Sequence, residues 1–248
     1  MEAKKIIITG GATRIGSAIA KSLAGYDVNI VIHFNKSRKS ALQLKMELEE
    51  IGAKVFLIKA DLSNINQTKK IVPFAYKKMK GLDCLINNAS LFEKDDLENF
   101  SDKSFSKHLD INLKAPAFLI KDFKRYVKNK EANIINIIDQ RVKKLTPFFF
   151  SYTLSKAALA TLTTTAAMKL APNIRVNGIA PGITLLAPGQ DQKAFEKSHR
   201  KNLLKSSSTV EEILNAIQLI ISTKSMTGHV TVLDGGSHLA PPRRDVGL

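Results

Sequence analysis

Tyr152 and Lys156 are the two side chains whose types and spacing most directly suggest chemistry. They stand four positions apart within residues 151–170, which the residue pattern predicts to be a helix, so both would lie on one face. A phenol with an ordinary pKa of about 10 is a poor acid or base at neutral pH, but a nearby ammonium favours its phenolate form. The pair therefore indicates proton transfer in hydride chemistry at a carbonyl or imine, and the lysine could also hold the ribose of a cofactor.

A glycine-rich segment near the N-terminus could bind a phosphate. It runs from Thr9 to Gly16, between a predicted strand at residues 4–9 and a predicted helix at residues 14–23. Such a turn lets the backbone approach a pyrophosphate, and the helix N-terminus supplies N–H groups and a partial positive charge. The alternative is an ordinary strand-to-helix turn. The cofactor contacts predicted here are Gly10, Arg14, Ile15 and Gly16.

The segment that follows the second predicted strand favours a phosphorylated cofactor. Carboxylates in this region usually hold the ribose hydroxyls of NAD, and residues 33–38 contain none. Lys36, Ser37 and Arg38 instead offer cations and a hydroxyl group that suit an ionised 2′-phosphate. The alternative is a solvated basic loop. We expect NADPH as the cofactor, with contacts from His33, Asn35, Lys36 and Ser37. A structural role is the alternative for His33.

Short apolar runs alternate with longer amphipathic ones along the chain. Strands are predicted at residues 4–9, 28–33, 54–59, 83–87, 133–138, 174–178 and 230–233, and helices at residues 14–23, 40–51, 67–79, 103–128, 151–170, 192–203 and 210–223. This alternation implies βαβ units with right-handed crossovers. We expect an α/β fold, a single doubly wound Rossmann-type domain over residues 1–248 with a seven-stranded parallel sheet flanked by helices, and a substrate loop at about 184–207.

The composition is that of a globular protein, with 44% hydrophobic and 24% charged residues. Cys84 is the only cysteine, so no internal disulfide can form. No signal peptide precedes the first strand and no apolar run has membrane-spanning length, which predicts a cytoplasmic protein with no membrane partner. The formal net charge of +16 comes largely from scattered lysines, which favours a solvated surface that attracts anionic ligands over nucleic-acid binding. His108, His199, His229 and His238 lack metal-ligand spacing, so no metal is expected.

From end to end, the chain resembles the short-chain dehydrogenase/reductase family. Its motifs are highly specific when taken together: Thr9-Gly10, Asp61-Leu62, Asn87-Asn88-Ala89, Asn112, Tyr152-x-x-x-Lys156, Pro181-Gly182 and Asp234-Gly235-Gly236. The resemblance implies a homotetramer. It also implies that Asp61 touches the adenine of the cofactor, and that Asn112 holds a water linking Lys156 to solvent as a proton relay. The further cofactor contacts that it implies are Leu62, Asn88, Ala89, Pro181, Gly182, Ile183 and Thr184, the last four bordering the nicotinamide.

Two positions depart from the common family pattern. Asp139 stands thirteen residues before Tyr152, where most members have a serine, and Arg14 replaces the middle glycine of the phosphate turn. Together with residues 87–92 and His33-x-x-x-Ser37, these departures resemble the pteridine reductases and the bacterial enzymes that reduce dihydromonapterin or dihydrofolate. That resemblance implies that Phe92 stacks on a pterin, sandwiching it against the nicotinamide, whereas the alternative for Phe92 is a loop-anchoring core residue. It also implies that Ser90 contacts cofactor and substrate, and that Arg14 contacts the cofactor phosphates and the substrate.

The chemistry of Asp139 is consistent with that branch of the family. An ionised carboxylate cannot donate a hydrogen bond to a substrate carbonyl, as a serine hydroxyl does. Beside Tyr152 it should oppose the effect of Lys156 and keep the phenol protonated, which suits a proton donor in a reduction. We therefore expect NADPH-dependent reduction of a pterin or folate. Tyr152 would donate the proton, Asp139 would be its partner, Lys156 would anchor the ribose, and Asn112 would support the relay.

Other functions stay open at this stage. The same scaffold could reduce a 3-oxoacyl thioester or another carbonyl, although such sites usually want a hydroxyl where Asp139 stands. Asp139 could also be a strand-end residue in a site that has lost activity. The charge of +16 leaves room for a nucleotide-sensing or nucleic-acid-binding module without turnover, although the set of Tyr152, Lys156 and Asn112 argues for catalysis. The substrate loop sets specificity in this fold, so the sequence does not choose among pterins and folates.

Overall fold

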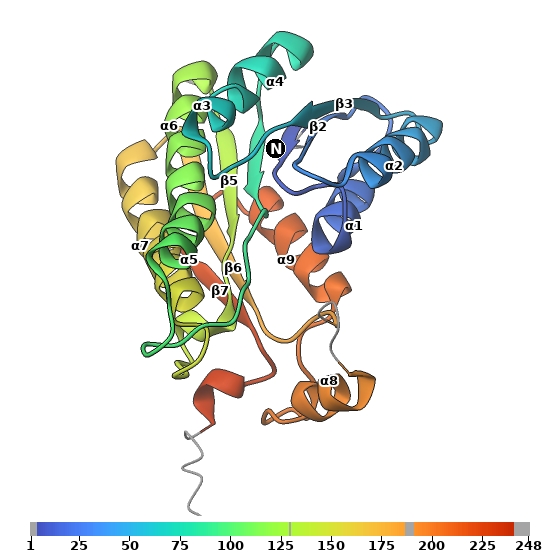
Figure 1. The fold of residues 1–248 in the computed structure, drawn as a ribbon. Helices are drawn as coiled ribbons and strands as arrows, with labels where there is room; N and C mark the ends of the chain where they lie inside the picture. The colour runs from blue at the N-terminus through green and yellow to red at the C-terminus, as the bar shows by residue number, and fades with distance from the viewer. Residues whose placement is uncertain (1–3, 129, 187–190, 241–248) are drawn as a thin grey trace, which may run out of the picture.

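The computed structural model describes residues 4–128, 130–186 and 191–240, and in this part of the chain strands and helices alternate as predicted (Figure 1). The strands are β1 (Lys5–Ile8), β2 (Asn29–Phe34), β3 (Lys54–Lys59), β4 (Cys84–Asn87), β5 (Ala132–Ile137), β6 (Ile174–Pro181) and β7 (Val230–Leu233). The α-helices are α1 (Arg14–Leu23), α2 (Arg38–Glu50), α3 (Ile65–Thr68), α4 (Ile71–Met79), α5 (Asp102–Leu109), α6 (Ala115–Val127), α7 (Phe150–Leu170), α8 (Gln192–His199) and α9 (Val210–Ser222).

The strands form one 7-stranded sheet in the order β3-β2-β1-β4-β5-β6-β7, and every pairing is parallel. This order confirms the predicted doubly wound, Rossmann-type sheet. The direction of winding reverses between β1 and β4. In open parallel sheets, ligands bind in the crevice at the carboxyl ends of the strands beside this reversal. The segments that follow β1, β4 and β5 therefore meet where a ligand site is expected.

Helices cover both faces of the sheet (Figure 1). Side chains alternate between the faces, so Ile6 and Ile8 join the core cluster with α1, α2 and α9, whereas Ile7 joins the cluster with α4, α6 and α7. Because both faces are buried, the strands are continuous apolar runs in the sequence rather than alternating ones. Within the described residues, no helix combines the length and the apolar character that crossing a membrane requires.

The predicted helix at residues 67–79 is divided into α3 and α4. Pro73 has no N–H to donate to the carbonyl of Lys69, and its ring crowds that carbonyl, so an unbroken helix is disfavoured at this point. The predicted helix at residues 192–203 also ends earlier, at His199, whose carbonyl accepts a hydrogen bond from Asn202 Nδ2 at 3.2 Å.

The predicted helix at residues 103–128 contains a π-helical turn, Asp110–Lys114, between α5 and α6. The turn lies just ahead of Pro116, which cannot donate a backbone hydrogen bond to the carbonyl of Asn112. Single π-helical turns inside α-helices are often found at functional sites. This one carries Asn112, which the sequence places among the site residues.

A buried chain of side-chain hydrogen bonds joins the central strands to α7. Asn87 Nδ2 donates to Asn136 Oδ1 at 2.8 Å, and Asn136 Nδ2 donates to Thr163 Oγ1 at 2.8 Å. Thr163 Oγ1 in turn donates to the carbonyl of Leu159 at 2.8 Å. These bonds fix α7 against β4 and β5, while Oδ1 of Asn87 is buried without a hydrogen-bond partner among the described residues.

Phe123 on α6 is fully buried in the cluster that α6 shares with α4 and α7, so Phe123→Ala is expected to open a large cavity. It should lower the free energy of unfolding by about 3–5 kcal/mol. The measurement is denaturant unfolding at one fixed protein concentration. Met46→Ala on the exposed face of α2 is the control, with an expected change within about 0.5 kcal/mol. A similar, small change in both variants would contradict the packing described for α6.

Candidate active site

Tyr152 lies in the first turn of α7 and faces the residues that follow β5. Its hydroxyl donates to Asp139 Oδ2 at 2.9 Å. One helical turn further on, Lys156 Nζ donates to the carbonyl of Ile137 at 2.7 Å and lies 5.8 Å from the centroid of the Tyr152 ring. Tyr152 and Lys156 are both almost fully buried. The structure therefore brings together the three acid–base residues that the sequence singled out, at the carboxyl end of β5.

The surroundings of Tyr152 keep its hydroxyl protonated. Burial and the Asp139 carboxylate raise the pKa of Tyr152 well above its ordinary value, while Arg141 and Ser90 act in the opposite direction. Burial lowers the pKa of Lys156 to about 8, although Asp139 favours its charged form. The upward effect of Asp139 agrees with the sequence-based expectation, but the groups that oppose it are Arg141 and Ser90 rather than the expected Lys156. A protonated phenol that is bonded to a carboxylate is suited to donate a proton rather than to accept one.

The two oxygens of the Asp139 carboxylate have different partners. Oδ2 accepts from Tyr152, whereas Oδ1 accepts from the backbone N–H of Arg141 at 2.8 Å and lies 3.5 Å from Nη1 of the Arg141 guanidinium. Arg141 belongs to the 3-10 turn Gln140–Val142 that follows β5. Sequence reasoning did not single out Arg141, and the only signal for it was a cation two positions after an acidic strand-end residue.

Asn112 joins the loop after β4 to the first turn of α7. Its Oδ1 accepts from the Leu91 N–H at 2.8 Å, and its Nδ2 donates to the Leu91 carbonyl and to Ser155 Oγ, both at 2.9 Å. Ser155 Oγ donates to the carbonyl of Tyr152 at 2.6 Å. The Ser90 hydroxyl donates to Asn112 Oδ1 at 3.3 Å. Asn112 thus positions the site, while its predicted part in a proton relay stays a prediction.

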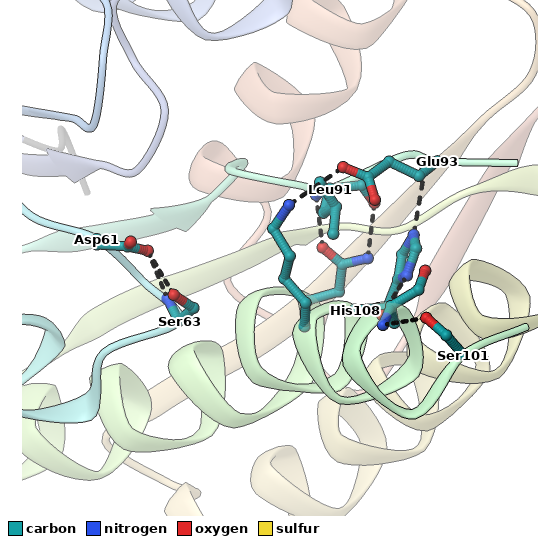
Figure 2. Close-up of polar contacts among 9 residues, drawn as sticks. Asp61, Ser63, Leu91, Glu93, Ser101 and His108 are labelled. Atoms are coloured by element: carbon teal, nitrogen blue, oxygen red, sulfur yellow. Dashed lines mark hydrogen bonds and ion pairs between the residues drawn. The ribbon is translucent and has the colours of Figure 1, made fainter.

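The same loop is fastened to α5 (Figure 2). The N–H of Glu93 donates to Nε2 of the buried His108 at 3.3 Å, and His108 Nδ1 therefore carries the proton that it donates to the carbonyl of Ser104 at 2.9 Å. The Glu93 carboxylate also pairs with Lys107 at 3.2 Å. Figure 2 shows Leu91 and Glu93 bonded to the helical segment, with the Asp61–Ser63 pair apart from them. His108 therefore has a structural role, joining the loop after β4 to α5.

Phe92 extends from this loop to the mouth of the site and is 45% exposed. One face of its ring stacks on Phe149, with a centroid separation of 4.5 Å and an interplanar angle of 7°. Its ring also meets Tyr152 edge-on at 4.7 Å. An exposed aromatic ring beside the acid–base pair could form one wall of a slot for a flat substrate. That Phe92 stacks on the substrate stays a prediction.

Phe149 immediately precedes α7 and has a left-handed backbone, with φ of 60°. Its N–H donates to the carbonyl of Asp95 at 2.7 Å, and the N–H of Ser151 donates to Asp95 Oδ1 at 3.1 Å. The buried Asp95 carboxylate therefore acts as the cap of α7 from the loop after β4. Sequence reasoning missed Asp95 and Ser155, because their roles depend on contacts between distant segments.

The glycine-rich turn after β1 has the backbone that a phosphate site needs. Gly10 has φ of 61°, and Arg14, which replaces the family glycine, keeps a left-handed φ of 53°. A Cβ at Gly16 would lie 2.1 Å from the carbonyl oxygen of Gly10, so only glycine fits there. Within the described residues, no side chain caps α1 and its first turn has no acidic residue. The turn therefore fits an anionic pyrophosphate. Ile15 packs on the core, so its side chain points away from the turn's outer surface.

His33 supports this turn from beneath. Nδ1 accepts from the N–H of Gly10 at 3.1 Å, and Nε2 donates to the carbonyl of Ala60 at 3.0 Å. Burial lowers the pKa of His33, so the neutral imidazole is favoured.

The glycine-rich turn is also joined to the end of β4. Thr9 Oγ1 accepts from the N–H groups of Asn88 and Ala89 at 3.0 and 3.1 Å.

The other residues predicted to bind the cofactor lie around the same edge of the sheet. Asn35, Lys36 and Arg38 are exposed at the end of β2, with Ser37 half-buried between them. The Asp61 carboxylate accepts from the N–H and the hydroxyl of Ser63 at 2.9 and 2.7 Å, and these bonds lower its pKa (Figure 2). Leu62 is buried in the core, so only its backbone can face a ligand.

The start of the predicted substrate loop also meets the glycine-rich turn. Arg14 Nη1 donates to the carbonyl of Leu186 at 2.9 Å. Pro181 ends β6, the Gly182 N–H donates to Ser208 Oγ at 3.1 Å, and Thr184 Oγ1 lies 2.7 Å from the same Ser208 Oγ. Ile183 is half-buried in this segment. Residues 187–190 of the predicted loop at about 184–207 lie outside the described residues.

Comparisons with known proteins agree with this geometry. Pteridine reductase 1 of Leishmania tarentolae is 29% identical over 94% of this chain and 96% of its own length. A 3-oxoacyl-[acyl-carrier-protein] reductase, FabG of Buchnera aphidicola, is 30% identical over 95% of this chain and 98% of its own length. The solved structure of FolM alternative dihydrofolate reductase 1 from Brucella canis, complexed with NADP, has a TM-score of 0.90 and 36% identity and covers 98% of this chain and 97% of that one.

The family resemblance seen in the sequence is also confirmed. A model of the short chain dehydrogenase family matches residues 4–198, which include the glycine-rich turn, Asn112, Asp139 and the Tyr152–Lys156 pair. The chain therefore belongs to the short-chain dehydrogenase family.

Proposed function

We propose that this protein is an NADPH-dependent reductase that converts a dihydropterin or dihydrofolate to its tetrahydro form. The observation that carries the proposal is the hydrogen bond from the Tyr152 hydroxyl to Asp139, at the position where most family members have a serine. The pteridine reductase and alternative dihydrofolate reductase relatives support the same substrate class.

The cofactor would occupy the edge of the sheet where β1 and β4 end. The uncapped end of α1 and the left-handed turn at Gly10 and Arg14 would hold its pyrophosphate. Lys36 and Arg38 would hold a 2′-phosphate, since both are exposed cations at the end of β2. When bound, NADPH supplies the hydride. The Brucella canis relative, whose structure is complexed with NADP, supports this choice.

Reduction of a C=N bond needs one hydride at carbon and one proton at nitrogen. Tyr152 would donate the proton, because its hydroxyl is kept protonated at the start of the reaction. Asp139 would orient that hydroxyl and could accept hydrogen bonds from the amine groups of a pterin. Lys156 would hold the cofactor ribose and face the phenolate that forms. Asn112 would support reprotonation through the relay predicted from the sequence.

A second candidate, reduction of a 3-oxoacyl thioester, is favoured by the FabG relative. The site argues against it, because the Asp139 carboxylate has no hydrogen to donate to a ketone oxygen. The homotetramer, the cytoplasmic location and the absence of a nucleic-acid partner stay predictions from the sequence.

The first prediction from the proposed function concerns substrate class. Purified protein should oxidise NADPH with dihydrofolate or dihydrobiopterin, followed by the absorbance of the reduced nicotinamide, and Tyr152→Phe should lower kcat by about 100- to 10,000-fold. Acetoacetyl-CoA serves as the parallel substrate for the second candidate. Turnover of the thioester without turnover of either pterin would overturn the proposal. Asp139→Ser should shift the preference toward the thioester.

The second prediction concerns the cofactor. Lys36→Glu should raise KM for NADPH by about tenfold or more, while changing KM for NADH much less, because only NADPH carries the 2′-phosphate. Lys224→Glu makes the same charge change at an exposed lysine after α9 and is the matched control. Equal effects of the two substitutions would mean that only the overall charge of the protein matters and that Lys36 holds no phosphate.

The third prediction concerns pH. Burial lowers the pKa of Lys156 to about 8, so the ammonium is present below that pH and is lost above it. If the ammonium holds the ribose, kcat/KM for NADPH should be level below about pH 8 and fall by up to about tenfold per pH unit above it. The Lys156→Arg variant keeps a positive charge at this position throughout this pH range. The kcat/KM of its remaining activity should therefore not fall above about pH 8. A level wild-type profile up to about pH 10 would exclude a need for the charge on Lys156.

A further inference from the structure

Arg141 has no part in the mechanism given above, yet it contacts the residue on which that mechanism depends. Its backbone N–H and its Nη1 both approach Oδ1 of Asp139, at 2.8 and 3.5 Å, while Oδ2 is left for the Tyr152 hydroxyl. The side chains of Arg141 and Asp139 are only 20% and 17% exposed. An ion pair that is this far removed from water is screened less than a surface pair.

Aromatic rings hold the guanidinium in place. Its central carbon lies 4.5 Å from the centroid of the Phe149 ring and 5.3 Å from that of Phe92. The stacking of these two rings on each other, and the left-handed backbone at Phe149, restrict where the rings can be. Arg141 Nε is buried and has no hydrogen-bond partner among the described residues, so the rings and Asp139 are the contacts that fix the cation.

The charges around Tyr152 affect how readily its hydroxyl releases a proton. When the hydroxyl releases its proton, a phenolate would form 2.9 Å from the Asp139 carboxylate, in a buried site. Two adjacent anions in such surroundings repel each other strongly. Arg141 acts against that repulsion, since it lowers the pKa of Tyr152 whereas Asp139 raises it.

We propose that Arg141 is a positioning residue, which holds the Asp139 carboxylate against Tyr152 and balances its charge so that Tyr152 can give up its proton. The proposal rests on the proposed function, because it concerns the proton that reduces the pterin. It differs from two simpler roles, a direct contact with the substrate and a purely structural contact with Phe149.

The test is a double-mutant cycle in kcat for dihydropterin reduction. Arg141→Met keeps the apolar stem and removes the charge, and it should lower kcat by about tenfold or more with little change in KM for the pterin. Arg141→Lys should recover part of the lost kcat, because it restores a cation near Asp139 without the stacking of the guanidinium on the rings. In an Asp139→Asn background, Arg141→Met should cost no more than about twofold, since the carboxylate on which it acts is gone.

Two results would overturn the proposal. If the losses in kcat from Asp139→Asn and Arg141→Met multiply in the double variant, Arg141 acts independently of Asp139. If Arg141→Met raises KM for the pterin without lowering kcat, Arg141 contributes to substrate binding. Arg125→Met, on the exposed side of α6, is the matched control and should leave kcat unchanged. Thermal melting of each variant identifies any that do not fold, and Arg141→Lys keeps the test decisive if Arg141→Met is one of them.

Failure of the proposed function would be recognised separately, because wild-type protein would then reduce neither pterin nor folate. In that case the crystal structure of Arg141→Met decides the positioning role. Asp139 should turn away from Tyr152 in that variant. An Asp139 that still accepts from the Tyr152 hydroxyl at the wild-type distance would refute the role.

Discussion

The hydrogen bond from the Tyr152 hydroxyl to Asp139 is the contact on which the rest of the site depends. It joins the end of β5 to the first turn of α7, two segments that a serine at position 139 would connect differently. Because Tyr152 is buried, its hydroxyl needs a partner and can exchange a proton only with the groups that face it. Placing a carboxylate there keeps the phenol protonated, and it replaces a donor toward the substrate by an acceptor. In the proposed function, the preference for a pterin or folate over a ketone follows from that exchange.

The first turn of α7 is fixed by hydrogen bonds from other segments of the chain rather than by its own residues. Phe149 precedes the helix with a positive φ and offers no capping oxygen, so the Asp95 carboxylate of the loop after β4 takes that place. On the other side, Ser155 is bonded to Asn112 in the π-helical turn. These contacts come from separate segments and converge on one helical turn. Such support fixes the Tyr152 hydroxyl before any ligand arrives, which is what a proton donor requires.

The sequence was sufficient for the strands, because each is a short apolar run between turn residues, and for the Tyr152–Lys156 pair, because four positions place two residues on one helix face. It was not sufficient for the breaks in helices, where the hydrogen bond that Pro73 cannot make outweighs a continuous helical pattern. It also missed Arg141 and Asp95, whose charges gain meaning only from segments folded beside them. For His33 the sequence left a structural role and a cofactor-lining role open. The structure puts it beneath the glycine-rich turn, with both ring nitrogens bonded to backbone.

The charges buried at the site account for a carboxylate that stands beside the proposed proton donor, Tyr152. At neutral pH the cluster contains the cations Lys156 and Arg141 and the anion Asp139, which leaves one net positive charge while Tyr152 is protonated. Release of the Tyr152 proton therefore leads to a neutral cluster. Without Arg141 the same step would lead from a neutral cluster to a negative one, which burial disfavours. A family member with a serine in place of Asp139 needs only its lysine to reach the same balance. In the proposed mechanism the two residues therefore act together: the Asp139 carboxylate changes what the site can bind, and the Arg141 guanidinium offsets its charge so that Tyr152 can release a proton.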